Sequence, residues 1–337
     1  MLSHEDNELL VRVGPGKPMG ELMRRYWLPA LLAEEIPVKD GPPVRVRLLG
    51  EDLVAFRDSE GRIGIMDAYC PHRGAPMFFG RNEECGLRCI YHAWKFDVTG
   101  KCVDIPSAPE GETFKEKVSI TAYPAVEKAG IIWVYMGPKE KQPPLPGFEW
   151  FDLPATHRYV DKFLIHCNYL QAMEGDYDPG HSYLHMTLDK NRTNQANRIR
   201  KANFFVNLWN NVELLEDAPH GVIHARTRPI DEQRTMLTMS PIMMPIFGTA
   251  GLTGPGVYAS NMRMPIDDEY TWWFRLRWSY DPIPEDELAE AKHGGFSYPE
   301  KIPGTYITKA NASNDYLIDR NLQRTYSVSG IQCFPLQ

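Results

Sequence analysis

Short strand-like runs, one of them directly after the turn signal DSEG, mark the first part of the chain as strand-rich. An opening helix is expected over residues 15–34, with a Pro at its start and an interruption at Pro29. Beyond it, strands are expected at residues 44–49, 53–57, 61–66 and 131–136. Residues 137–150 are rich in Pro and Gly and carry little periodicity, which is typical of a linker between two domains.

The second part of the chain mixes strand-like and helix-like runs. Strands are expected at residues 159–166, 204–209, 221–228 and 270–280, and helices at 168–188, 284–292 and 314–325. In the run 270–280, the large apolar residues occupy alternate positions, which predicts a strand with one buried face. The pattern as a whole predicts the α+β class, with an antiparallel sheet and accompanying helices in this part.

Length and charge narrow the class of protein. The chain has 337 residues, 43% of them apolar and 24% charged, which fits two globular domains. Its net charge of −7 argues against a nucleic-acid partner, because phosphate binding requires a basic face. No window approaches the roughly 18 apolar residues of a membrane span. The polar N-terminus does not resemble a signal peptide, so a cytoplasmic protein is expected.

Two Cys and two His residues form two closely spaced pairs. One residue separates Cys70 from His72, two separate Cys89 from His92, and sixteen lie between the pairs. Such a set suits either a tetrahedral zinc ion or a Rieske [2Fe–2S] cluster, in which one iron is held by two thiolates and the other by two imidazoles. Glycines in the flanking loops favour the cluster, since they let backbone N–H groups approach the bridging sulfides.

The remaining cysteines do not fit this spacing. We interpret them as ordinary small buried residues: Cys85, Cys102, Cys167 and Cys333. A zinc site pairing Cys85 with Cys89 is an alternative, but it would compete with the better-spaced set.

A second metal motif lies further along the chain. His181 and His185 are four residues apart, which places both imidazoles on one face of a helix, and Asp178 precedes them. Two imidazoles and a carboxylate form the facial triad of non-haem Fe(II) oxygenases. A His pair with this spacing is also common on helix surfaces, and Asp178 also suits the N-cap of that helix.

These motifs resemble the phthalate dioxygenase group of Rieske non-haem iron oxygenases from about residue 8 to the end. The resemblance is carried by CPHRGAPM, CIYHAWKFDVTGKC, QAMEGDYDPGH and NDYLIDRNLQRT. It implies a Rieske β-domain over residues 1–143 with the cluster on the four ligands above. It also implies a helix-grip (START-like) catalytic domain over residues 144–337. Ala75 stands where respiratory Rieske proteins carry an additional Cys, which matches the oxygenase and ferredoxin branch.

The resemblance also assigns roles to the second motif. It implies that His181 and His185 bind a mononuclear Fe(II) in a homotrimer. Asp178 would then bridge this iron to a cluster His, either His72 or His92, of a neighbouring subunit. The family more often places four residues between the two His, and this chain has three.

The family takes its third iron ligand, an Asp, from a late helix. We expect this Asp beyond Gln337, so the catalytic domain is expected to be incomplete at its C-terminus. Asp315 and Asp319 are the nearest alternatives within the chain, and we interpret both as helix-surface carboxylates.

By resemblance, the chain is a reductase-dependent oxygenase that uses O₂ to hydroxylate or dihydroxylate a small aromatic substrate, expected to be an aromatic acid. Electrons would come from NAD(P)H through a separate flavin and iron–sulfur reductase. One alternative is O-demethylation of a methoxylated, biaryl, lignin-derived aromatic. Alternatives from other classes are a Rieske electron-transfer protein and a non-enzymatic helix-grip ligand-binding protein.

The sequence leaves the substrate undecided. A carboxylate would be bound by an Arg at the pocket wall, and four are candidates that also suit a surface position: Arg198, Arg200, Arg226 and Arg228. The Met-rich segment 235–248 would instead line a pocket for a larger apolar ligand, or simply pack in the core.

Overall fold

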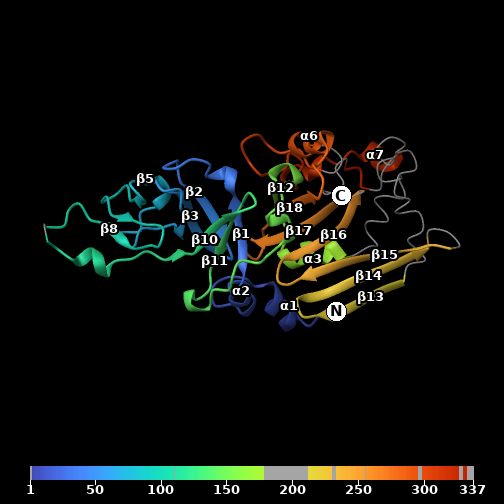
Figure 1. Ribbon diagram of the computed structural model, residues 1–337, viewed down its shortest axis with the longest axis horizontal. Helices are drawn as coiled ribbons and strands as arrows, with labels where there is room; N and C mark the ends of the chain where they lie inside the picture. Colours follow the sequence, from blue (N-terminus) through green and yellow to red (C-terminus); the bar gives the residue numbers. More distant parts are fainter. Residues whose placement is uncertain are drawn as a thin grey trace. The chain divides into compact units, whose positions relative to one another are not determined.

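The computed structural model describes residues 2–109, 111–177, 212–229, 233–254, 256–294, 298–325 and 329–331. The chain divides into two compact units (Figure 1). Unit 1 comprises Met1–Asp152 and Met264–Tyr270, and unit 2 comprises Leu153–Arg263 and Thr271–Gln337. The segment Met264–Tyr270 contains the connection between two adjacent strands of unit 2, so the second unit is discontinuous in sequence.

Unit 1 consists of two short helices and three small antiparallel sheets. The helices are α1 (His4–Val11) and α2 (Pro18–Met23). The sheets have the strand orders β1-β11-β10, β2-β3-β4-β9 and β5-β6-β7-β8. Their strands are β1 (Trp27–Leu32), β2 (Val44–Leu48), β3 (Glu51–Arg57), β4 (Ile63–Asp67), β5 (Arg81–Glu83), β6 (Gly86–Arg88), β7 (Lys95–Phe96), β8 (Cys102–Asp104), β9 (Ala122–Tyr123), β10 (Ala125–Lys128) and β11 (Ile131–Tyr135). Short 3₁₀ helices lie between some of these strands, namely η1 (Ala33–Glu35), η2 (Met77–Phe79) and η3 (Phe114–Lys117), and two more follow β11, namely η4 (Lys139–Lys141) and η5 (Glu149–Phe151).

The opening helix is shorter than predicted. It ends at Met23, and residues 27–32 form β1 instead, all six of them buried and five of them paired with β11. Pro29 sits at a register shift in this edge strand, where a missing N–H removes no essential ladder bond. The helix prediction was therefore wrong for this stretch, because a fully buried apolar run has the same appearance in a helix and a strand.

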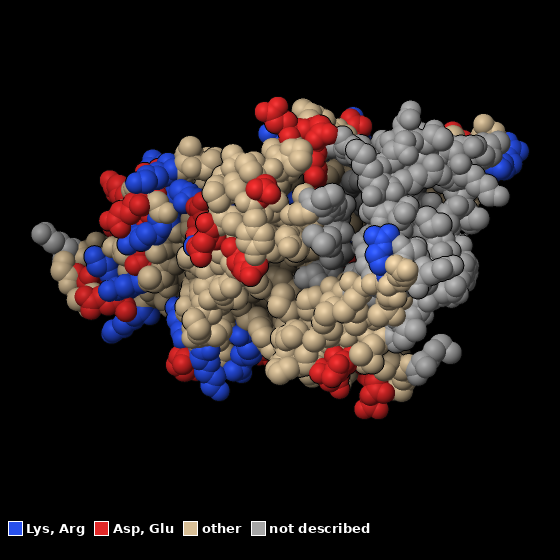
Figure 2. Space-filling model, turned by 45° about the vertical axis from the view of Figure 1, so that its right-hand side comes forward, with Lys and Arg blue, Asp and Glu red and all other residues tan. Residues whose placement is uncertain are grey.

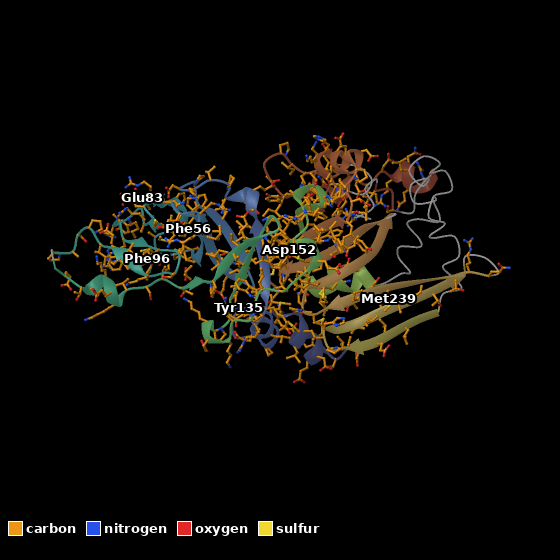
Figure 3. The ribbon with its side chains drawn as sticks, viewed as in Figure 1. Phe56, Glu83, Phe96, Tyr135, Asp152 and Met239 are labelled. Carbon is orange, nitrogen blue, oxygen red and sulfur yellow. The ribbon has the colours of Figure 1, made fainter. Side chains whose placement is uncertain are left out.

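One hydrophobic core joins the second and third sheets of unit 1. It contains Phe56 of β3 and Phe96 of β7, both completely buried (Figure 3). Cys70 and Cys89 belong to the same core, as does Cys102, which confirms that Cys102 is a small buried residue. The two cysteine ligands predicted from the sequence are thus anchored in close-packed surroundings.

Unit 2 is built on one seven-stranded antiparallel sheet with the order β12-β18-β17-β16-β15-β14-β13. Its strands are β12 (Arg158–Ile165), β13 (Val212–Ala218), β14 (Gly221–Pro229), β15 (Thr235–Met243), β16 (Phe247–Gly254), β17 (Val257–Pro265) and β18 (Thr271–Ser279). The helices described in this unit are η6 (Ala155–His157), α3 (Tyr169–Tyr177), α6 (Glu285–His293), η8 (Ala312–Leu317) and α7 (Arg320–Thr325). Sheet and helices confirm the α+β class. The strand expected at 204–209 and most of the helix expected at 168–188 lie outside the described residues.

The helix predicted over residues 314–325 is broken in two. Inside η8 the backbone of Asp315 and Tyr316 turns to φ values of 51° and 54°, so this segment does not form a regular helix. A new helix then starts, with the Asp319 carboxylate accepting the N–H groups of Asn321 and Leu322 at 2.8 and 3.0 Å. A side-chain cap of this kind competes with helix continuation, and helical periodicity does not reveal it.

Strand β18 is buried on both faces, whereas the alternation predicted one buried face. Arg275 and Arg277 on the second face are each only 6% exposed. The Arg275 guanidinium lies 4.4 Å from the centre of the Tyr298 ring, and burial lowers the pKa of Arg277. The Tyr298 ring also lies 5.9 Å from the Arg277 guanidinium, so side chains packed against this face cover its two arginines.

The surface carries charges of both signs. On the face drawn in Figure 2, Lys and Arg side chains of the described residues are interspersed with Asp and Glu rather than gathered into one basic area. Within the described residues, no helix combines the length and apolar character that crossing a membrane requires.

Candidate metal centre

The first predicted ligand pair lies in a tight loop that follows β4. The Cys70 N–H donates to the carbonyl of Ala75, and the Gly74 N–H donates back to the carbonyl of Cys70, both at 2.9 Å. Gly74 has φ +68°, the left-handed region that glycine adopts at no steric cost. The loop therefore closes on itself and holds Cys70 and His72 at fixed positions.

The second pair lies in a loop of the same backbone design between β6 and β7. The Cys89 N–H donates to the carbonyl of Trp94 at 2.8 Å, and the Ala93 N–H donates to the carbonyl of Cys89 at 3.1 Å. Ala93, the fourth residue after the Cys, has φ +61° and thus repeats the conformation of Gly74. The loops differ in where the His stands, two residues after Cys70 and three after Cys89.

The structure brings all four predicted ligands together. The ring centres of His72 and His92 are 4.5 Å apart. Cys70 and Cys89 are each 3% exposed, and the Cys89 thiol is close enough to interact with that of Cys70. Burial, together with the charge of Cys89, raises the pKa of Cys70 to about 11. Sulfur is therefore grouped with sulfur and imidazole with imidazole.

His72 meets the requirements of a metal ligand. Among the described residues, its buried Nδ1 has no hydrogen-bond partner, which is costly for a polar atom away from water. Burial, and then the positive charges of His92 and Arg73, lower the pKa of His72 and favour the neutral imidazole. Neutral imidazole is the form that binds metal. A metal at this nitrogen would satisfy the orphaned atom.

The arrangement suits a two-iron cluster. Within the parts of the chain that the structure describes, no three His, Cys, Asp or Glu side chains form a group suited to one metal ion. A Rieske cluster makes a different demand, namely one pair of ligands for each iron. Backbone N–H groups also point at the sulfurs: those of His72 and Arg73 at Cys70, and that of Tyr91 at Cys89, the last at 3.5 Å. Such bonds stabilise thiolates and tune the potential.

The two histidines differ in their surroundings. Trp94 is buried and stacks on His72, with ring centres 4.3 Å apart and planes within 6°. His92 is exposed and lies beside Tyr91, which is 64% exposed. The sequence left open which His faces outward, and the fold places His92 at the accessible edge.

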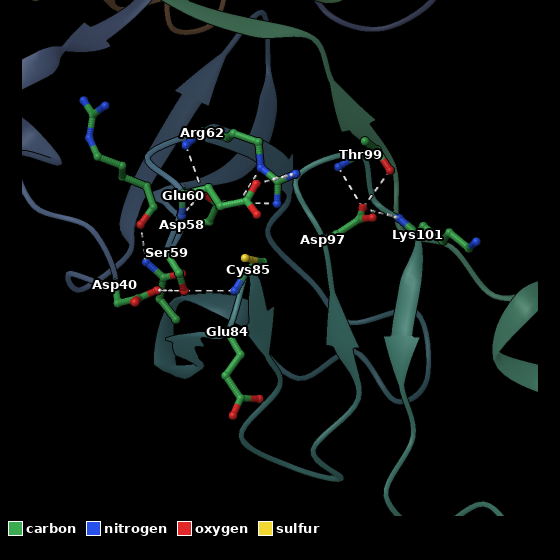
Figure 4. A network of polar contacts seen from close by, with 12 residues as sticks. Asp40, Asp58, Ser59, Glu60, Arg62, Glu84, Cys85, Asp97, Thr99 and Lys101 are labelled. Carbon is green, nitrogen blue, oxygen red and sulfur yellow. Dashed lines mark hydrogen bonds and ion pairs between the residues drawn. The ribbon is translucent and has the colours of Figure 1, made fainter.

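Cys85 belongs to a turn rather than to the ligand set. It has φ +61° in the β5–β6 hairpin, and its N–H donates to the Ser59 hydroxyl at 3.0 Å (Figure 4). Ser59 in turn donates to Asp40 at 2.7 Å. Cys85 is half-buried, as is Cys167, whereas Cys333 lies outside the described residues.

Asp178, His181 and His185 lie outside the described residues, directly after the end of α3 at Tyr177. Of the alternative carboxylates, Asp315 is exposed and Asp319 caps α7.

The residues considered for substrate binding are only partly described. Arg226 and Arg228 belong to β14, and Arg198 and Arg200 lie outside the described residues. The Met-rich segment forms β15 and the start of β16. Met239 of β15 is exposed (Figure 3). Leu237 is exposed as well, while Ser240 and Ile242 are buried.

The sequence analysis missed a buried ion pair at the end of α3. Both oxygens of Asp176 accept from Arg263 of β17, at 2.8 Å from Nε and 2.5 Å from Nη2. Asp176 also accepts from Asn261, whose own oxygen accepts from Trp273 of β18 at 2.9 Å. The Arg263 guanidinium lies 3.7 Å from the centre of the Trp273 ring. The network fixes the end of α3, two residues before Asp178. In the sequence, this ion pair was indicated by nothing more than a second Asp beside the metal motif.

Removing one member of this pair is expected to destabilise unit 2 strongly. Asp176→Ala would leave Arg263 buried and unpaired, which costs about 3–5 kcal/mol for such a pair. Urea denaturation, with hydrogen exchange of β17 and β18, measures the effect. Asp152→Ala, which removes the exposed partner of Lys128, is the matched control and should change little. Equal stability of the two variants would contradict a structural role for the network.

Comparison with known protein families agrees with this geometry. Residues 26–124 match the family described as "Rieske [2Fe-2S] domain", and residues 134–337 match that described as "LigXa C-terminal domain like". The first match contains all four predicted cluster ligands, and the second contains Asp178, His181 and His185.

Characterised relatives cover nearly the whole chain. The 3-chlorobenzoate-3,4-dioxygenase oxygenase subunit of Comamonas testosteroni is 38% identical over 97% of this chain and 78% of its own length. The phthalate 4,5-dioxygenase oxygenase subunit of Pseudomonas putida is 36% identical over 100% of this chain and 78% of its own length. The 5,5'-dehydrodivanillate O-demethylase oxygenase subunit of Sphingobium sp. (strain NBRC 103272 / SYK-6) is 36% identical over 94% and 73%.

Solved structures share the fold. Dicamba monooxygenase bound to 3,6-dichlorosalicylic acid superposes with a TM-score of 0.61 at 18% identity, covering 80% of this chain and 83% of that one. The terminal oxygenase of carbazole 1,9a-dioxygenase from Nocardioides aromaticivorans IC177 gives a TM-score of 0.59 at 19% identity, covering 85% and 82%. At these identities the likeness concerns the fold alone.

Proposed function

We propose that this chain, which belongs to the oxygenase subunits of the Rieske non-haem iron oxygenases, oxygenates an aromatic acid. The observation that carries the proposal is the meeting of two buried Cys and two neighbouring His on two matched loops. The relatives at 38% and 36% identity are named for 3-chlorobenzoate and phthalate, both aromatic carboxylates. An electron-transfer protein would need only the first unit, whereas this chain also has the second.

Each of the chain's own ligands has a separable task in this proposal. Cys70 and Cys89 hold one iron in the dry core, and His72 and His92 hold the other nearer the surface. When bound, the cluster supplies single electrons, and a mononuclear iron provides the place where O₂ is activated. Trp94 keeps water from one side of His72. His92 offers the exposed edge through which electrons leave.

A homotrimer is part of the proposal, because it would place the cluster of one subunit beside the iron of the next. We assign the contact on the cluster side to His92, since it is exposed and His72 is covered by Trp94. On the iron side the contact is assigned to Asp178, whose carboxylate would accept from the free N–H of His92. Electrons reach the cluster from a separate flavin and iron–sulfur reductase.

Asp178→Asn is expected to retain both metals and the trimer but to slow electron transfer from cluster to iron severely. The amide keeps the shape of the carboxylate while removing the charge that orients the imidazole. Single-turnover stopped flow on pre-reduced protein, with substrate and O₂, measures cluster reoxidation. Glu174→Gln, a neighbouring carboxylate on α3, serves as the control. Reoxidation at the wild-type rate would remove Asp178 from this role.

The proposed activity is tested with a panel of aromatic acids, a surrogate reductase and NADH, with products identified by mass. Dihydroxylation adds both atoms of O₂ together with two electrons and two protons. O-demethylation, the second candidate, is favoured by the 36% identity to a dehydrodivanillate O-demethylase. It places one oxygen atom on the methyl carbon, which leaves as formaldehyde, and reduces the other to water. A reduced, iron-loaded protein that yields neither product with any acid would contradict the proposed substrate class.

A further inference from the structure

The second cluster loop contains a strained residue that the first loop avoids. Both loops turn through the left-handed region at the fourth residue after the Cys, at Gly74 with φ +68° and at Ala93 with φ +61°. Glycine adopts this conformation freely, whereas a Cβ makes it unfavourable. The first loop thus has a residue suited to its turn. In the second loop, other contacts must hold Ala93 in place.

Arg88 supplies those contacts. Its Nη1 donates to the carbonyl oxygen of Ala93 at 2.7 Å and to Asp104 at 2.7 Å. Its Nε donates to Glu83 at 2.6 Å. The side chain is 15% exposed, so these charge-assisted bonds are only weakly screened by water. Because Arg88 directly precedes Cys89, one side chain ties the beginning of the loop to its far end.

We infer that Arg88 is a positioning residue for the Rieske cluster: it holds the second loop in the turn that glycine provides in the first. This inference rests on the proposed role of Cys89 and His92 as ligands. Ala93 stands between His92 and Trp94, and Trp94 stacks on the other imidazole. Fixing the carbonyl of Ala93 therefore fixes the backbone on which both imidazoles depend.

The two carboxylates have their own part in the arrangement. Glu83 and Asp104 come from β5 and β8, on either side of β6 and β7, and they aim the guanidinium at the loop. With Arg88 present their charges are partly neutralised. Without it, Asp104 would lose this ion pair and Glu83 would keep only that with the exposed Arg81. The negative charge near the cluster loop would then be less compensated, and adding an electron to the cluster would become less favourable. Arg88 is thus expected to raise the reduction potential as well as to hold the loop.

The test compares four variants of the full chain, each loaded with its cluster. They are Arg88→Met, Ala93→Gly, the two changes combined, and Arg81→Met. Arg81 is the matched control, because it pairs with the same Glu83 but is 73% exposed. Cluster loss to a chelator is followed by visible absorption, the midpoint potential by redox titration, and the ligand geometry by the paramagnetic spectrum of the reduced protein.

Arg88→Met is expected to lose its cluster roughly tenfold faster or more, since a charge-assisted hydrogen bond is removed. Adding Ala93→Gly should restore most of the retention, because the turn then needs no support. The potential should fall in both Arg88 variants, since the charge stays absent. Arg81→Met should remain within about twofold of the parent in retention, as a screened surface pair does.

Three results would overturn the inference. They are retention in Arg88→Met equal to that in Arg81→Met, a failure of Ala93→Gly to restore it, and an unchanged potential. If Arg88→Met alone does not fold, recovery of a folded, cluster-containing chain on adding Ala93→Gly supports the inference, and no recovery overturns it. None of these measurements uses substrate or reductase. A failure of the proposed substrate class would therefore leave them unaffected.

Discussion

Replacing Cys70 by Ser or His92 by Ala is expected to remove the visible absorption and the paramagnetic signal of the reduced Rieske cluster. Each iron takes two ligands from the protein, so losing one leaves that iron with a single protein ligand and an open coordination position that water can occupy. Cys70 is also part of the core, and a hydroxyl there cannot replace a soft thiolate. Absorption, paramagnetic resonance and iron and sulfide content of the purified variants measure the loss.

Cys85→Ser is the matched control for the cysteine variant. It makes the same chemical change four residues before Cys89, in a hairpin turn whose hydrogen bond to Ser59 is made by the backbone. This variant should keep its full cluster content. Retention of the Rieske signal in Cys70→Ser or His92→Ala would show that the four-residue ligand set is wrong. Loss of the signal in Cys85→Ser would instead revive the alternative that pairs Cys85 with Cys89.

Variants of the second metal motif are expected to lose oxygenase activity while keeping the Rieske cluster. His181→Ala or His185→Ala should reduce product formation to the level of the reaction without enzyme, because two imidazoles supply most of the protein's hold on the iron. The Rieske spectrum should remain intact, since the cluster ligands belong to the other unit. Product mass, O₂ consumption and iron content per chain measure both parts of this prediction.

A control for general damage is available on the same unit. His293→Ala removes an exposed imidazole at the end of α6 and should preserve turnover. Iron analysis should find one iron fewer in His181→Ala than in this control. Surviving turnover in either ligand variant would contradict the assignment, as would loss of cluster colour in both.

The sequence by itself determined the features that depend on local chemistry. The ligands of the cluster could be recognised because C-x-H and C-x-x-H spacings place donors within one tight loop each, whatever surrounds them. The family matches contain these motifs at the expected places. Strands such as β2, β12 and β14 followed from short strand-like runs, and α6 from a helix-like acidic run, since each run reflects the preference of one element alone.

Only the tertiary structure decided features that depend on distant partners. The apolar run of β1 suits either a helix or a strand, and pairing with β11, about a hundred residues later, selects the strand. The Asp176–Arg263 ion pair joins residues 87 positions apart, so no local sequence pattern predicts it. The exposure of His92 and the stacking of His72 on Trp94 arise from how two loops meet. The turn at Gly74 could be expected from its residue type, because glycine favours the left-handed region. The same turn at Ala93 could not, because a contact from Arg88 supports it rather than the preference of alanine.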